Sequence, residues 1–222
     1  MEFLLIPLGI AVVIGIFVIA WKLEQKRREK WTAWAKQNGW SYDHRKDREV
    51  SRRLAFLDKL NQGSNRYAMH RLQGEWKNRP AEAFTFHYET HSTDSKGRRK
   101  THHHHVGVVL LRIEKVFPEL TIAPEGFLSK IAQAVGYDDI DFESIEFSKK
   151  FVVRSEDKKF AYDFCHTRMM EYLLQNPRTT LELDRNILAI YDGNRLEPEE
   201  IEPYLDQLHT IREWMPDYLF SD

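Results

Sequence analysis

Residues 66–113 read RYAMHRLQGEWKNRPAEAFTFHYETHSTDSKGRRKTHHHHVGVVLLRI, and this stretch decides the fold. Apolar and polar side chains alternate over residues 66–76, 81–90 and 102–113, which predicts three β-strands. The first connection, which ends at Pro80, is tight, and the second is a longer polar tip that contains Gly97 and a basic run. Because such connections join antiparallel neighbours, we predict a meander of three strands.

The segments that flank this meander place the chain in the α+β class. Before it, a helix is expected to run through residues 22–38 and end at Gly39, and residues 50–60 favour a short helix. After it, we predict a break at Phe117–Pro118, a helix over 126–135 and a strand over 140–155. A helix over 157–175, broken near His166, comes next. A hairpin over 180–192 that turns at 184–186 and a helix over 198–215 complete the domain. We therefore expect one domain of antiparallel strands packed with about three helices.

The chain opens with a run of residues without a charge, FLLIPLGIAVVIGIFVIAW over residues 3–21. As a helix this run spans about 28 Å, close to the hydrocarbon thickness of a bilayer. A basic cluster follows at once, which by the positive-inside rule places the C-terminal domain in the cytoplasm and the N-terminus outside. We therefore predict a single-pass protein of the inner (cytoplasmic) membrane. Its parts are a transmembrane anchor (1–21), a basic juxtamembrane helix and connector (22–65) and a cytosolic α+β domain (66–222).

Charge and composition narrow the classes of partner. The formal net charge is −1, but residues 22–53 carry eleven Lys or Arg against five acidic residues, so the rest of the chain is acidic on balance. An acidic domain argues against nucleic-acid binding. Ala11 and Gly15 form a small-xxx-small pair, which leaves a homo-oligomer open. The residues expected to contact lipid headgroups or an acidic partner are Lys22, Lys26, Arg27, Arg28, Lys30, Lys96, Arg98, Arg99 and Lys100.

A run of four histidines, His102 to His105, is the most prominent polar feature. On a strand, alternate members of the run face opposite sides, and His87 and His91 on the preceding strand come opposite one of the two pairs. Several imidazoles on one face suit Zn²⁺, Ni²⁺ or Cu²⁺. The alternative is a solvated strand end without a metal. The candidate ligands are His87, His91, His102, His103, His104 and His105.

Motifs for catalysis or for binding a cofactor are missing from the sequence. It contains no phosphate-binding G-x-x-x-x-G-K-[ST] or G-x-G-x-x-G and no G-x-S-x-G nucleophile elbow. The segment His87–His91 places a Glu between two histidines, but not in the zincin order and not on a helix. We expect a membrane-anchored accessory or scaffold protein that binds another protein without catalysis. The alternative is a membrane-tethered metal-binding sensor or hydrolase that uses the histidines.

Two segments, FESIEFSKKFVVRSEDKKFAYDFCHTRMMEYLL over 142–174 and ILAIYDGNRL over 187–196, resemble a family of bacterial membrane-anchored proteins that carry a domain of unknown function. In that family an E-F-x-K-x-F-x-V core precedes an Asp and a Met-rich helix. Ser148 and Arg168 depart from the usual Asn and Pro. The resemblance implies this fold and a membrane anchor but no chemistry. The matching residues are Glu146, Phe147, Lys150, Phe151, Val153, Asp157, Ala161, Tyr162, Met169, Met170 and Leu173.

Overall fold

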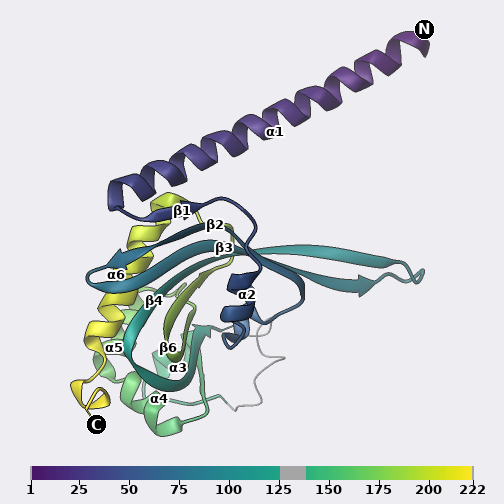
Figure 1. Cartoon of the computed structure of the whole chain (residues 1–222). Helices are drawn as coiled ribbons and strands as arrows, with labels where there is room; N and C mark the ends of the chain where they lie inside the picture. Colours follow the sequence, from purple (N-terminus) through teal and green to yellow (C-terminus); the bar gives the residue numbers. More distant parts are fainter. Residues whose placement is uncertain (1, 126–138, 222) are drawn as a thin grey trace.

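The computed structural model describes residues 2–125 and 139–221, with the side chains of the first helix described from Ile14 onward (Figure 1). A long N-terminal helix leads into a curved antiparallel sheet that carries shorter helices. The elements are α1 (Glu2–Asn38), β1 (Ser41–Asp43), α2 (Glu49–Arg53), η1 (Asp58–Leu60), β2 (Ser64–Trp76), β3 (Arg79–Thr93), β4 (Arg99–Pro124), α3 (Ile145–Lys150), β5 (Phe151–Ser155), α4 (Lys158–Phe164), α5 (Thr167–Gln175), β6 (Leu181–Asp192), α6 (Pro198–Trp214) and η3 (Asp217–Leu219).

The predicted meander is confirmed. β2, β3 and β4 are antiparallel neighbours, and β1 extends the sheet beside β2. β4 is long enough to pair with β3 along its first half and with β5 near its end, while β6 lies along its other side. The turn between β2 and β3 uses two residues with positive φ, Lys77 (49°) and Asn78 (66°). That pair of angles matches the right-handed twist of a hairpin, so the turn keeps the two strands in register.

Both faces of the central strands are buried, which is why β3 and β4 are almost continuously apolar there. One face packs against α4, α5 and α6 through residues such as Val109, Leu188 and Leu205. The opposite face is covered by α2 and η1, where Leu54 and Leu57 contact Phe84 and its neighbours. The confirmed α+β class thus has helices on both sides of one sheet (Figure 1).

α1 is one continuous helix, as expected, and it ends before Gly39, whose φ of +70° suits a helix terminus. Within the residues whose placement the structure describes, no helix is apolar over a length that would cross a bilayer. This finding contradicts the predicted transmembrane anchor over 1–21 and, with it, the single-pass inner-membrane location with the N-terminus outside.

The C-terminal half of α1 belongs to the core of the domain. Trp31 is fully buried, and its ring stacks on those of Tyr42 and His70 at centroid distances of 6.0 and 5.5 Å. Arg27 Nη2 donates to the carbonyl oxygen of Leu196 (3.0 Å), just before α6 begins. Packing of this helix on the sheet therefore accounts for the aromatic residues that follow its basic cluster.

Two segments differ from the expected elements. The strand predicted over 140–155 begins only at Phe151, because the Ser144 hydroxyl accepts a hydrogen bond from the backbone N–H of Phe147 and starts the short helix α3. The hairpin predicted over 180–192 is the single strand β6, in which Arg185 has a positive φ (54°) and lies opposite Phe117, where the register between β4 and β6 shifts.

Three further predictions concern neighbouring segments. The expected break at Phe117 is a register shift inside β4, which continues to Pro124. The helical segment over 157–175 does break near His166, between α4 and α5. The helix predicted over 126–135 lies outside the described residues.

Gly74 on β2 gives a direct test of this packing. A Cβ atom at this position would lie 2.5 Å from the ring of Trp40, which is itself buried and donates from Nε1 to the carbonyl oxygen of Glu75 (3.1 Å). We expect Gly74→Ala to lower the free energy of unfolding by about 1–3 kcal/mol, measured by urea denaturation. In a Trp40→Ala background the same change should cost little. An equal cost in both backgrounds would contradict the proposed steric overlap.

Candidate functional site

β3 and β4 stay paired beyond the point at which their other neighbours end. Their pairing continues to Thr93 and Arg99, whereas β2 leaves β3 at Glu89 and β6 leaves β4 at Gly107. Residues 90–106, which we call the long hairpin, therefore project from the domain as two strands without a third (Figure 1). The six candidate ligand histidines of the sequence analysis lie on this hairpin and at its root.

The register of the hairpin sorts these histidines onto two faces. His87 lies opposite His105, and Glu89 lies opposite His103, so these four side chains share one face of the sheet. The intervening pairs, which include His102 and His104, lie on the other face. The four consecutive histidines are thus divided between two different environments.

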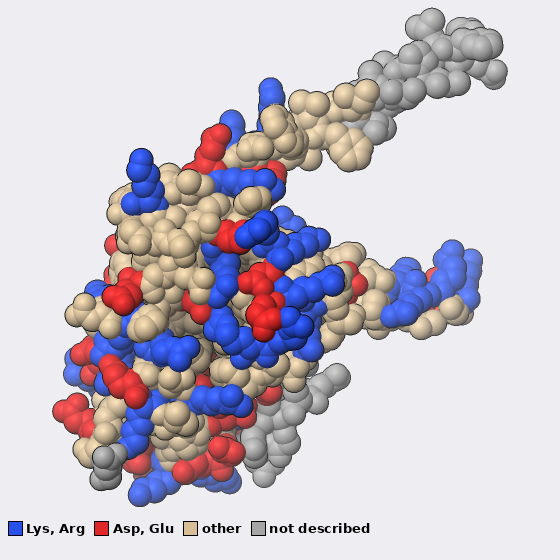
Figure 2. Space-filling view, viewed as in Figure 1, with Lys and Arg blue, Asp and Glu red and all other residues tan. Residues whose placement is uncertain are grey.

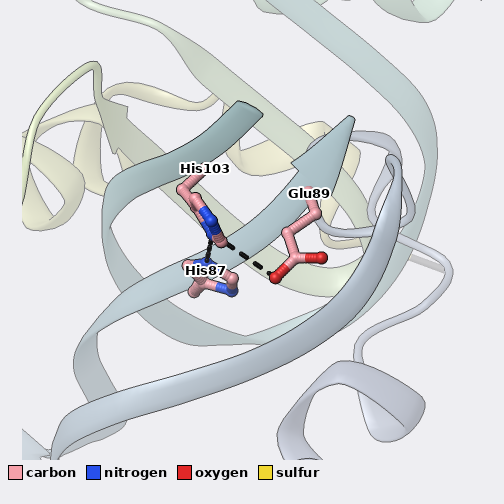
Figure 3. Close-up of side chains that lie close together, drawn as sticks. All are labelled: His87, Glu89 and His103. Carbon is pink, nitrogen blue, oxygen red and sulfur yellow. Dashed lines mark hydrogen bonds and ion pairs between the residues drawn. The ribbon is translucent and has the colours of Figure 1, made fainter. Parts of the chain in front are cut away.

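Three potential ligand groups converge at the root of the hairpin, as Figure 3 shows. His87 Nε2 lies 3.2 Å from His103 Nδ1, and the same His103 nitrogen lies 3.3 Å from Glu89 Oε1. One ligand atom from each residue lies within 4.8 Å of the other two. Asn65 on β2 contacts two of the three residues: its carbonyl oxygen lies 3.1 Å from His87 Nδ1, and its Nδ2 donates to Glu89 Oε1 (2.6 Å).

These contacts fix the orientation of His87 and Glu89. A carbonyl oxygen only accepts hydrogen bonds, so Nδ1 of His87 donates its hydrogen to Asn65 and Nε2 is the ring nitrogen that faces His103. The hydrogen bond from the Asn65 amide lowers the pKa of Glu89, which therefore remains ionised at neutral pH. The cluster thus combines a carboxylate with an imidazole ring of fixed orientation.

His105 lies beside this group. Its ring meets that of His87 edge-on at a centroid distance of 5.1 Å. Burial and the neighbouring Arg195 lower the pKa of His105 to about 4, and the Arg195 guanidinium donates to its Nε2 (3.1 Å). His105 is therefore neutral, with one ring nitrogen already engaged.

The other predicted ligands lie apart from the cluster. His91 contacts the hydroxyls of Thr101 (3.1 Å) and Ser64 (3.2 Å) further along the hairpin. On the opposite face, His102 contacts the Ser92 hydroxyl, and His104 stacks on Tyr88. Of the six histidines proposed from the sequence, the structure brings together His87 and His103, with His105 adjacent.

Glu89 is the member of the cluster that sequence reasoning missed. It lies two residues after His87 on the same strand face, and the residue opposite it is His103. The first relation is visible in the sequence, but the second depends on the register of the hairpin. Asn65, which orients the group, comes from a third strand and has no signal in the sequence.

Of the basic residues predicted to contact lipid headgroups or a partner, some form ion pairs within the protein and others are exposed. In the helical segment, Arg27 pairs with Glu197, Arg28 with Glu24 and Lys30 with Glu199, while Lys22 and Lys26 are exposed. At the hairpin tip, Arg98 pairs with Asp94 (2.9 Å), while Lys96, Arg99 and Lys100 are exposed. Figure 2 shows this tip as an isolated group of Lys and Arg side chains.

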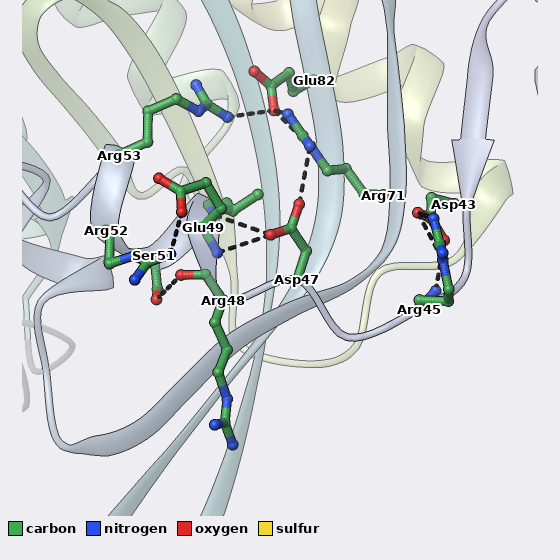
Figure 4. A network of polar contacts seen from close by, with 11 residues as sticks. Asp43, Arg45, Asp47, Arg48, Glu49, Ser51, Arg52, Arg53, Arg71 and Glu82 are labelled. Atoms are coloured by element: carbon green, nitrogen blue, oxygen red, sulfur yellow. Dashed lines mark hydrogen bonds and ion pairs between the residues drawn. The ribbon is translucent and has the colours of Figure 1, made fainter.

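Cations of the connector after α1 are largely neutralised by neighbouring carboxylates, as Figure 4 shows. Arg71 on β2 joins Asp47 (3.0 Å) to Glu82 (3.1 Å), and Arg53 also reaches Glu82 (2.8 Å). Asp47 Oδ1 in turn accepts the backbone N–H of Glu49 at the start of α2. This network attaches α2 to the sheet, so the basic excess of the segment is mainly structural.

Comparisons with known proteins found a similarity of fold but no similarity of sequence. No family model and no curated protein sequence matches it. Among solved structures, the crystal structure of the mycobacterial trehalose monomycolate transport factor A, TtfA, is similar over 84% of this chain and 90% of that chain. The TM-score is 0.53 and the sequence identity is 12%, so the likeness shows that the two proteins share a fold.

Proposed function

We propose that this protein is a non-catalytic accessory protein that binds another protein through the long hairpin. The observation that carries the proposal is the projection of this hairpin from the sheet with both edges unpaired among the described residues. An isolated two-stranded hairpin is marginally stable in water, and proteins generally protect exposed strand edges. An ordered hairpin that extends so far is best explained as a surface for a partner.

The tip of the hairpin supports a partner with an acidic surface. Asp94 organises the turn by accepting the backbone N–H groups of Lys96 and Arg98, both at 2.9 Å. The exposed charges of Lys96, Arg99 and Lys100 have no carboxylate partner among the described contacts. Complementary charges at a projecting tip accelerate encounter and fix orientation.

The similarity to TtfA agrees with an accessory role. That protein is named as a transport factor for trehalose monomycolate. We carry over to this chain only the accessory role, since a shared fold does not transfer a substrate. α1 also exposes the apolar side chains of Ile16, Phe17 and Trp21 before its charged part begins.

Charge reversal at the hairpin tip tests the proposal. The full chain, tagged and expressed at its natural level, is expected to purify with one protein at near-stoichiometric yield. The variant Lys96→Glu/Arg99→Glu/Lys100→Glu should reduce that yield at least about tenfold, because it replaces attraction by repulsion. Quantitative mass spectrometry gives the measurement.

The matched control reverses three exposed charges elsewhere, Lys149→Glu/Lys158→Glu/Lys159→Glu on α3 and α4. It makes the same change in net charge and should retain the partner. Equal retention by both variants, or no stoichiometric protein with the natural chain, would refute binding through the hairpin.

A further inference from the structure

We propose that His87, Glu89 and His103 form a binding site for a first-row divalent transition metal ion, with Zn²⁺ as the representative ion. The site lies at the root of the long hairpin and does not depend on the proposed protein partner. The ligand atoms are His87 Nε2, Glu89 Oε1 and His103 Nδ1, which all lie within 4.8 Å of one another.

The spacing of the donor atoms fits such an ion. A tetrahedral Zn²⁺ with bonds of about 2.0–2.1 Å to nitrogen keeps two ligand nitrogens about 3.3 Å apart. His87 Nε2 and His103 Nδ1 are 3.2 Å apart, and His103 Nδ1 and Glu89 Oε1 are 3.3 Å apart. Two imidazoles and one carboxylate suit Zn²⁺ and its neighbours in the series, whereas Mg²⁺ and Ca²⁺ prefer sites built from oxygen.

Asn65 supplies the outer contacts that metal sites use. Ligand histidines usually donate their second ring N–H to a carbonyl or a carboxylate, which fixes the tautomer and the ring orientation. His87 does so through Nδ1 to the carbonyl oxygen of Asn65 (3.1 Å), and the side chain of the same residue holds Glu89 at 2.6 Å. The Tyr67 ring stacks on His87 at 4.4 Å and restricts its rotation further.

Burial of the three groups differs in a way that leaves access for an ion. His87 is 3% exposed, while the side chain of His103 is 60% exposed and that of Glu89 is 16% exposed. The buried imidazole and the carboxylate form the floor, and His103 closes the site from the solvent side. The Glu89 carboxylate supplies negative charge to the ligand set, which favours a cation even near Arg195.

A bound ion would connect β3 to β4 where the hairpin leaves the sheet. Because Asn65 belongs to β2, the ion and its outer contacts would involve three adjacent strands. The direction in which the hairpin projects would then be fixed more firmly with metal than without it. Metal binding is therefore expected to slow hydrogen exchange of hairpin amides and to raise the melting temperature.

Calorimetric titration of the full chain with Zn²⁺ tests the site. We expect one ion per chain for the natural protein, and an affinity at least about tenfold lower for His103→Ala and for Glu89→Gln. Both substitutions are on groups that solvent reaches, and Glu89→Gln keeps the shape of the side chain. Asn65→Ala should weaken binding in the same direction without removing a ligand.

The matched control is His102→Ala, which removes the adjacent histidine of the same run from the opposite face. It should leave the Zn²⁺ affinity and the metal-dependent rise in melting temperature unchanged. If His102→Ala weakens binding as much as His103→Ala, the ions bind to the histidine run without a defined site and the proposal fails. It fails equally if the natural chain binds no stoichiometric Zn²⁺.

Discussion

Replacing Trp31 by alanine is expected to lower the free energy of unfolding by about 3–5 kcal/mol, the usual cost of truncating a large buried aromatic side chain. Trp31 is fully buried on α1, and its ring stacks on Tyr42 and His70 from β1 and β2. The hydroxyl of Tyr42 lies 2.7 Å from His70 Nδ1, so the three aromatic groups form one unit. Loss of the indole would remove the main contact that holds α1 against the sheet.

Urea denaturation followed by circular dichroism measures this effect, and the same helix provides the control. Trp21 is 61% exposed, so Trp21→Ala should change the free energy of unfolding by less than about 0.5 kcal/mol. Trp31→Phe should cost less than Trp31→Ala, because it keeps the aromatic packing and removes an indole N–H without a described hydrogen-bond partner. Similar losses for Trp21→Ala and Trp31→Ala would show that α1 is not part of the core.

The central sheet could be predicted because its strands carry a local pattern. Period-two alternation located β2, β3 and β4, and the short connections fixed their antiparallel order. Near Phe84 and Val108 both faces are buried, so the alternation is lost there, but β-branched and aromatic residues preserve the strand signal. Local sequence was sufficient because sequential neighbours are also neighbours in space.

The errors occur where one pattern allows two structures. A register irregularity and a tight turn both use polar residues with positive φ, so residues 184–186 favoured a hairpin in the sequence, whereas Arg185 lies inside a single strand in the fold. At α3, the apolar residues Phe142, Ile145 and Phe147 suggested a strand, while Ser144 caps a short helix. The membrane anchor was predicted from the uncharged run over residues 3–21 and the basic cluster after it, but among the described residues no helix is apolar over a length that would cross a bilayer.

Only the histidines of the candidate site could be predicted from the sequence. Because the sequence predicted two adjacent strands, His87 was expected to approach part of the histidine run, and it does approach His103. The register that pairs Glu89 with His103, and the position of Asn65 on the next strand, follow from the assembled sheet. Ligands contributed by different strands become recognisable only when that register is known.

Glu182 on β6, whose carboxyl group is fully buried, should contribute strongly to the change of stability with pH. Burial raises its pKa to about 8, although it accepts hydrogen bonds from the Tyr191 hydroxyl and from the backbone N–H of Asp58, both at 2.6 Å. The native state therefore keeps this proton at pH values where the unfolded chain has already released it. Stability is fully present below the unfolded pKa and is lost as the pH rises through the folded pKa.

We expect the free energy of unfolding to fall between pH 5 and pH 9 by on the order of 3 kcal/mol through this group. Burial also raises the pKa of the nearby Glu119 to about 7, which acts in the same direction. Glu182→Gln keeps the shape and the acceptor oxygen but cannot ionise, so its stability should be less dependent on pH and should exceed that of the natural chain at pH 9. Urea denaturation at several pH values gives the comparison.

The control is Glu171→Gln on the exposed surface of α5, which should follow the natural chain at every pH. Parallel pH profiles for Glu182→Gln and the natural chain would mean that Glu182 ionises in the native state without a large cost. A less steep profile for Glu182→Gln than for the natural chain would instead support a neutral carboxyl group in the core. That result would explain how β6 tolerates an acidic residue between Leu181 and Leu183, because an uncharged carboxyl group can be buried once its hydrogen bonds are made.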